Sequence, residues 1–139
     1  MPAKGQDASM LASRYLAKLI GPLFLAIGAG MLLNGQVYRA MAAQYLASYA
    51  LIYVSGLFAL TVGIAIVLAH NVWTANWRVI ITILGWLLVI GGAVRIVIPQ
   101  FIQRVGGTMF HLAALPIIGG ALVVVLGLVL CNFGYRGKI

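Results

Sequence analysis

Four apolar stretches, each long enough to cross a bilayer as a helix, dominate this sequence. They lie near residues 15–34, 49–69, 77–98 and 110–133. About 20 apolar residues span the hydrocarbon core, and a chain with 64% hydrophobic and 7% charged residues lacks the polar surface of a water-soluble globule. We therefore expect an all-α membrane protein, a bundle of four transmembrane helices forming one domain over residues 1–139, with 1–14 as a tail and interfacial start.

The second half of the chain repeats the glycine pattern of the first half. At an offset of 64 residues, without gaps, Arg14 aligns with Arg78 and four glycine pairs coincide: Gly21 with Gly85, Gly28 with Gly92, Gly56 with Gly120 and Gly63 with Gly127. This predicts two tandem helix–arm–helix repeats, at about 7–71 and 71–135, related by a pseudo-two-fold axis along the membrane normal. The first apolar stretch also has the length of a signal-peptide core, but the repeat needs it as a helix, so we expect it to be retained.

Each apolar stretch carries two of these glycines seven residues apart, which places them on one stripe of a helix. Helices in lipid gain little by hiding apolar side chains from each other, so close approach at small residues holds them together. We expect all eight glycines to face the interior of the bundle.

Positive charge flanks the apolar stretches. Nine Lys and Arg residues oppose the single acidic residue, Asp7, for a net charge of +8. Four spans place both ends of the chain on one side, which then holds Lys4, Arg14, Lys18, Arg78, Arg136 and Lys138, against Arg39, Arg95 and Arg104 opposite. The positive-inside rule predicts cytoplasmic termini. Because the charges are scattered and not gathered in a patch, we expect anionic lipid headgroups as partners and no nucleic acid.

The segment HNVWTANW, residues 70–77, is the main polar interruption in the middle of the chain. His70 and nearby polar residues can satisfy the backbone groups left open at the ends of the flanking helices. Trp73 and Trp77, with Arg14 and Arg78, have the side chains of membrane-interface anchors. We interpret the segment as a turn at the membrane surface; the alternative is a headgroup-docking patch formed with Arg14 and Arg78.

Arg95 is the charge that most needs an explanation, because no span contains an acidic residue to pair with it. It lies close enough to the end of its helix to reach the outer headgroups with its long side chain, and we favour this interpretation. The alternative is an anion site built from Arg95, Arg104 and backbone amides around GGTMF, residues 106–110.

Most catalytic and cofactor chemistry lacks its residues in this chain. Asp7 alone provides no carboxylate pair, catalytic triad or ion-coupling site in a span. His70 and His111 are expected on opposite membrane faces, and His70 with Cys131 would still be only two ligands, so we expect no metal site, no cofactor and no enzymatic activity. Trp86, near mid-membrane, is interpreted as a space-filling side chain; contact with a quinone or carotenoid is the alternative.

Two resemblances bear on the fold. The segments HNVWTANWRVIITILGW, IGPLFLAIGAGMLLN and LIYVSGLFALTVG resemble a family of short four-span bacterial proteins described only as uncharacterised integral membrane proteins, which implies a bacterial inner membrane and no particular activity. GGAVRIVI followed by GGTMF is similar to the opening of small dimeric fluoride channels. The asparagine-glycine-serine segment that those channels carry after the GT pair is replaced here by HLAALPIIGG.

These observations favour a small, non-enzymatic integral membrane protein that packs against a partner: a second copy, a larger membrane complex or anionic lipid. The alternative is a passive anion pore or channel, which a dimer could form. A pore requires a continuous polar lining. The spans offer only Ser55, Thr61 and Thr82 for that purpose.

Overall fold

The computed structural model describes residues 3–112 and 114–136, and within them it contains six helices and no strand. The helices are α1 (Ala3–Leu33), α2 (Gly35–Ala47), α3 (Tyr49–Ala69), α4 (Arg78–Val97), α5 (Pro99–Phe110) and α6 (Leu115–Arg136). Four of them, α1, α3, α4 and α6, are long and apolar enough to cross a membrane. The predicted all-α architecture with four spans is therefore confirmed.

Local chemistry explains where these helices begin and end. Pro99 opens α5, and the preceding Ile98 leaves the helical conformation, as steric contact with the proline ring favours, so α4 ends there. The hydroxyl of Ser48 accepts a hydrogen bond from the Leu51 amide at 3.3 Å and caps the start of α3. At the other end of the chain, residues 3–14, which we expected to form a tail and interfacial start, are the first turns of α1.

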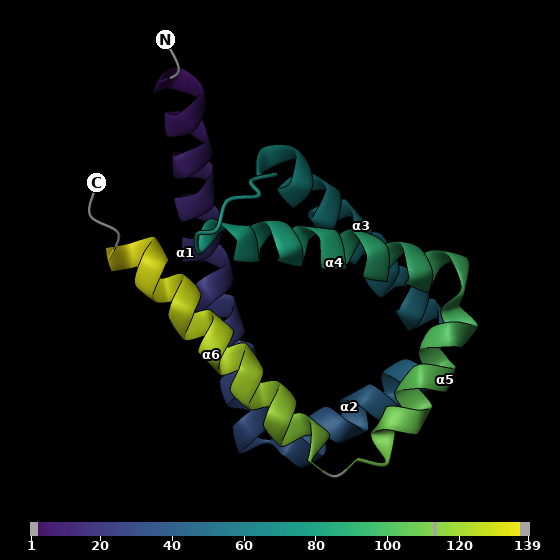
Figure 1. Ribbon diagram of the computed structural model, residues 1–139. Coiled ribbons are helices and arrows are strands. Elements are labelled where there is room, and N and C mark those ends of the chain that lie inside the picture. Colours follow the sequence, from purple (N-terminus) through teal and green to yellow (C-terminus); the bar gives the residue numbers. More distant parts are fainter. Residues whose placement is uncertain (1–2, 113, 137–139) are drawn as a thin grey trace.

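The four spans pack as two pairs. α1 lies along α6, α3 lies along α4, and the two short helices α2 and α5 lie beside each other (Figure 1). The pairs meet near Ser13 and His70 and diverge toward α2 and α5, which lie across the wide end of the molecule (Figure 1). Each pair combines one helix from each half of the chain, and the offset of 64 residues exchanges one pair with the other.

Glycines line the contact within each pair. A Cβ added at Gly92 would lie 2.5 Å from the Leu60 amide nitrogen, and one added at Gly63 would lie 2.6 Å from the Val89 nitrogen. The α1–α6 pair has the same arrangement, because a Cβ at Gly28 would lie 2.9 Å from the Gly120 carbonyl oxygen. The remaining five repeat glycines also face the partner helix of their own pair: Gly21, Gly56, Gly85, Gly120 and Gly127. The glycines thus lie at two separate contacts and not around one common centre.

Few side chains are buried from all sides. The buried apolar cluster is formed by Ala17, Ile20, Ile66, Ile81 and Leu130, where α1 meets the other spans. Beside it, the rings of Trp77 and Phe133 stack in parallel with centroids 5.3 Å apart and connect the start of α4 to α6. Most other large apolar side chains on the spans are exposed, which suits helices whose surroundings are lipid.

Candidate functional site

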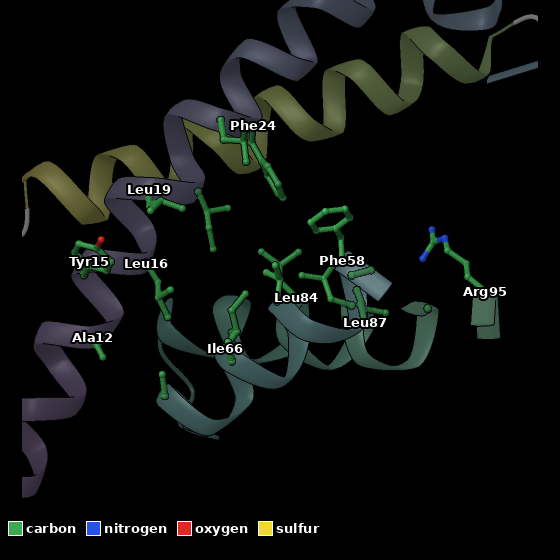
Figure 2. A pocket seen from close by; sticks show the side chains of 18 residues that line it. Ala12, Tyr15, Leu16, Leu19, Phe24, Phe58, Ile66, Leu84, Leu87 and Arg95 are labelled. Carbon is green, nitrogen blue, oxygen red and sulfur yellow. The ribbon is translucent and has the colours of Figure 1, made fainter. Parts of the chain in front are cut away.

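An apolar cleft of about 840 Å³ separates α1 from the α3–α4 pair. Figure 2 shows Phe24 of α1 and Phe58 of α3 projecting into it from opposite sides, with Leu84 and Leu87 of α4 on its floor. Arg95 lies at one end of the cleft, and Ala12 lies at the other (Figure 2). On α1 the lining runs from Ala12 to Phe24, about 18 Å at 1.5 Å per residue.

Small side chains create much of this space. Ala59, Ala65 and Ala69 of α3, with Gly91 of α4, present little volume on the face of the pair that looks toward α1. Since the two helix pairs also diverge from their meeting point, side chains from α1 do not fill the gap. The cleft volume lies in the range of about 300–1,000 Å³ that is usual for small-molecule sites.

Arg95 is the one charged residue that lines the cleft, and hydrogen bonds fix the position of its side chain. Its Nε donates to the Tyr45 hydroxyl oxygen at 3.2 Å. The Tyr45 and Ser55 hydroxyls are 2.7 Å apart, and Ser55 donates to the Ile52 carbonyl at 2.8 Å, so the tyrosine proton points to Ser55. This chain of donors joins α2, α3 and α4 and holds the guanidinium at the end of the cleft.

The structure does not bring Arg104 to this place. Arg104 lies on α5 and is not among the residues that line the cleft. Residues 106–110, whose amides we considered for an anion site, belong to the helical turns of α5, so their amides serve the helix. The alternative of an anion site built from Arg95, Arg104 and these amides thus finds no common location in the described residues.

A second polar group lies where the two pairs meet. His70 is 1% exposed, and its Nε2 pairs with the Ser13 hydroxyl while its Nδ1 lies 3.2 Å from the Thr82 hydroxyl. Arg78 donates from Nε to Ser13 at 3.0 Å and from Nη2 to Ser9 at 2.8 Å. Burial lowers the pKa of His70, and the positive charge of Arg78 lowers it further despite an opposing backbone hydrogen bond. The neutral imidazole therefore acts as a connector between α1 and the turn.

The other residues of the 70–77 segment have ordinary structural contacts. Trp73 is exposed, and its indole N–H donates to the Asn71 side chain at 2.8 Å. Trp77 stacks on Phe133, as described above, and the Arg78 guanidinium is directed to Ser9 and Ser13 of α1. Arg14 lies on α1 directly after Ser13. These contacts support the interpretation of the segment as a turn. The sequence did not indicate that this turn is bonded to α1.

Other candidate residues do not converge on the cleft. Cys131 lies half-buried on α6, where its Sγ would be 2.7 Å from a Cβ added at Gly21. Trp86 of α4 is 38% exposed and lies outside the cleft lining. In the part of the chain that the structure describes, no three His, Cys, Asp or Glu side chains gather as metal ligands would.

No family model, curated protein or solved structure matches the chain. The fold and the cleft therefore define the class on their own: an all-α protein with four candidate membrane spans in two glycine-contacted pairs, and an apolar cleft between the pairs that carries one cation. The two resemblances noted in the sequence stay predictions.

Proposed function

We propose that this chain is a small, non-enzymatic integral membrane protein that binds a membrane lipid in the cleft between its helix pairs. The observation that carries the proposal is the cleft itself, about 840 Å³ of space lined by apolar side chains apart from Arg95 and the Tyr15 hydroxyl. Such a lining favours hydrocarbon, and the surrounding bilayer supplies hydrocarbon at high concentration.

The charge of Arg95 favours a lipid over a second copy of the chain. A copy carries one acidic residue, Asp7, which lies near the start of α1, so it brings no counter-charge to the opposite end of the cleft. A lipid headgroup can bring one. A second copy of the chain or a larger membrane complex, which the sequence also left open, would more readily contact the exposed apolar faces of the spans.

Gentle detergent extraction followed by native mass spectrometry tests the proposal. We expect wild-type protein to retain lipid and the Ala65→Phe variant, which fills the cleft, to lose it. Ile64→Phe is the matched control, because Ile64 is the neighbouring exposed residue on α3 and does not line the cleft. Equal lipid retention by the two variants, or a retained polypeptide in place of lipid, would overturn the proposal.

We propose further that the protein resides in a bacterial inner membrane with both termini in the cytoplasm. The distribution of Lys and Arg supports this orientation, with Arg78 on the side of the termini and Arg39, Arg95 and Arg104 opposite. Reporter fusions at the C-terminus and in the α2–α3 connection test it. Activity of a periplasmic reporter at the C-terminus would show the reverse orientation.

A passive anion pore is the second candidate, and the observation that favours it is Arg95 at the end of a cleft within the spans. Against it, the other candidate polar side chains are engaged: Ser55 bonds to Ile52, and Thr61 bonds to the Leu57 carbonyl at 2.8 Å. Fluoride and chloride flux into proteoliposomes tests this candidate. We expect no flux above protein-free vesicles, whereas ion-selective flux that Arg95→Ala abolishes would replace our proposal with the pore.

A further inference from the structure

We infer that the lipid in the cleft is an anionic phospholipid, with its phosphate at Arg95 and an acyl chain lying along the cleft toward Ala12. This inference rests on the proposed function and adds the headgroup chemistry and the orientation. Its starting observation is that the polar end of the cleft is built by three helices, through the hydrogen bonds from Arg95 to Tyr45 and from Tyr45 to Ser55.

The predicted repeat has none of these three polar residues at the corresponding positions of the other helix pair. At the offset of 64 residues, Tyr45, Ser55 and Arg95 correspond to Met109, Gly119 and Met31. The α1–α6 pair therefore packs in the same glycine-contacted way without any of the three. A structural requirement common to both pairs would have left polar residues at both places.

Several small residues that line the cleft have larger counterparts in the other helix pair. The small residues Ala65, Ala69 and Gly91 that line the cleft correspond to the larger residues Val129, Phe133 and Ile27. In the α1–α6 pair, Phe133 stacks on Trp77, whose own counterpart is Ser13, at the contact between α1 and His70. The cation and the small side chains of this cleft are thus both missing from the corresponding positions of the other helix pair, as expected for a site that needs both.

The depth of Arg95 matches a headgroup. Arg95 is two residues from the end of α4 and about 26 Å from Arg78 along the helix axis, close to the hydrocarbon thickness of about 30 Å. A phosphate near Arg95 would therefore lie at the membrane surface opposite the termini. Along α4 the cleft lining runs from Arg95 back to Leu84, about 17 Å, which covers an acyl chain through its own leaflet of about 15 Å.

The chemistry of Arg95 selects an acidic headgroup. Its hydrogen bond to Tyr45 uses Nε and orients the guanidinium, and Nη1 and Nη2 form the pair of donors that a phosphate accepts from. The one acidic residue, Asp7, lies near the start of α1, beyond the opposite end of the cleft, and cannot neutralise Arg95. A zwitterionic lipid brings its own cation to the same place, so an anionic phospholipid such as phosphatidylglycerol is the better match.

The test is a competition in nanodiscs that contain equal amounts of phosphatidylglycerol and phosphatidylcholine, with the retained lipid identified by native mass spectrometry. Wild-type protein is expected to retain phosphatidylglycerol preferentially. Arg95→Met, which installs the counterpart residue Met31, should lower that preference roughly tenfold, the fold-change for one charge-assisted hydrogen bond. Arg104→Met is the matched control, because Arg104 lies on the same side of the membrane outside the cleft, and its preference should equal that of wild type.

Two further variants separate this inference from the proposed function. Ala65→Phe removes all lipid if the cleft is the site, and Tyr45→Phe keeps the charge but releases the guanidinium, so it should lower the preference several-fold. If wild type and Arg95→Met retain the two phospholipids in the same ratio while Ala65→Phe clears both, the cleft binds lipid but the headgroup assignment is wrong. A retained free fatty acid in place of phospholipid contradicts the assignment in the same way. If Ala65→Phe retains as much lipid as wild type, the proposed function itself fails.

Discussion

Replacing Gly92 with alanine should weaken the α3–α4 pair. The added Cβ would lie 2.5 Å from the Leu60 nitrogen and 2.9 Å from the Gly56 carbonyl oxygen, whereas ordinary contacts begin at 3.4 Å. Both atoms belong to the backbone of α3, which cannot turn aside as a flexible side chain would. The helices must therefore separate by about 0.9 Å, the difference between 3.4 and 2.5 Å.

The cost follows from the dispersion energy lost along the contact. A gap of 0.5–1 Å forfeits about a quarter to a half of each atom-pair attraction, and each pair contributes about 0.15 kcal/mol. With roughly 40 close atom pairs, as around one buried leucine, the loss is about 2 kcal/mol. The same value lies within the usual cost of overpacking, about 1–3 kcal/mol.

Equilibrium unfolding in mixed detergent micelles, followed by circular dichroism, measures this loss. Gly107→Ala is the matched control, because Gly107 is also helical and a Cβ there meets nothing within 4 Å. The better helix propensity of alanine should leave that variant as stable as wild type or up to about 1 kcal/mol more stable. A Gly92→Ala variant as stable as Gly107→Ala would refute the role assigned to the glycine contacts.

The polar connection between α1 and the turn yields two further predictions. Because the pKa of His70 is lowered in the fold, the unfolded state binds the proton better. The free energy of unfolding is therefore highest above about pH 6.5 and falls as the pH drops from there through the lowered pKa. Unfolding of the His70→Gln variant should lack this pH dependence. Thr82→Val should cost about 1–3 kcal/mol, because it leaves His70 Nδ1 and the Val72 amide without a partner. Thr61→Val loses one exposed bond within its own helix and should change the free energy of unfolding by less than about 0.5 kcal/mol.

The fold class could be predicted because lipid leaves a chain few options. The apolar stretches near 49–69 and 77–98 agree closely with α3 and α4. A helix satisfies the backbone groups of its own segment without a partner, as a membrane span requires. The connecting arms became the helices α2 and α5, and α1 began earlier than the apolar stretch because residues 3–14 continue its helix. Length and hydropathy determined the spans, but they carry less information on amphipathic flanking helices.

The pairing and the site could not be predicted, because they depend on contacts between distant residues. A glycine stripe marks a face that admits close approach, but it does not say that α1 meets α6 and not α3. Arg95 finds its hydrogen-bond partner in Tyr45, 50 residues away, and no pattern in the sequence links the two. The predicted repeat did contain a usable signal, namely an arginine at position 95 where the corresponding position 31 has a methionine.

The difference between the two helix pairs leads to a last prediction, in which one residue is replaced in each pair. Ala69 lines the cleft, and its counterpart Phe133 stacks on Trp77. Ala69→Phe places a ring into open space, so we expect a change of less than about 1 kcal/mol in the free energy of unfolding. Phe133→Ala removes a stacked ring that is 39% exposed, and the lost stacking and packing should cost about 1–3 kcal/mol.

Which of the two variants is less stable tests whether the cleft is open space. If both faces were equally packed, the larger side chain at position 69 would overpack its surroundings and cost at least as much as the truncation at position 133. Unfolding of both variants under the conditions used for Gly92→Ala decides between these outcomes. Equal destabilisation would mean that the cleft between α1 and the α3–α4 pair closes in the membrane, and the lipid site would have to be abandoned with it.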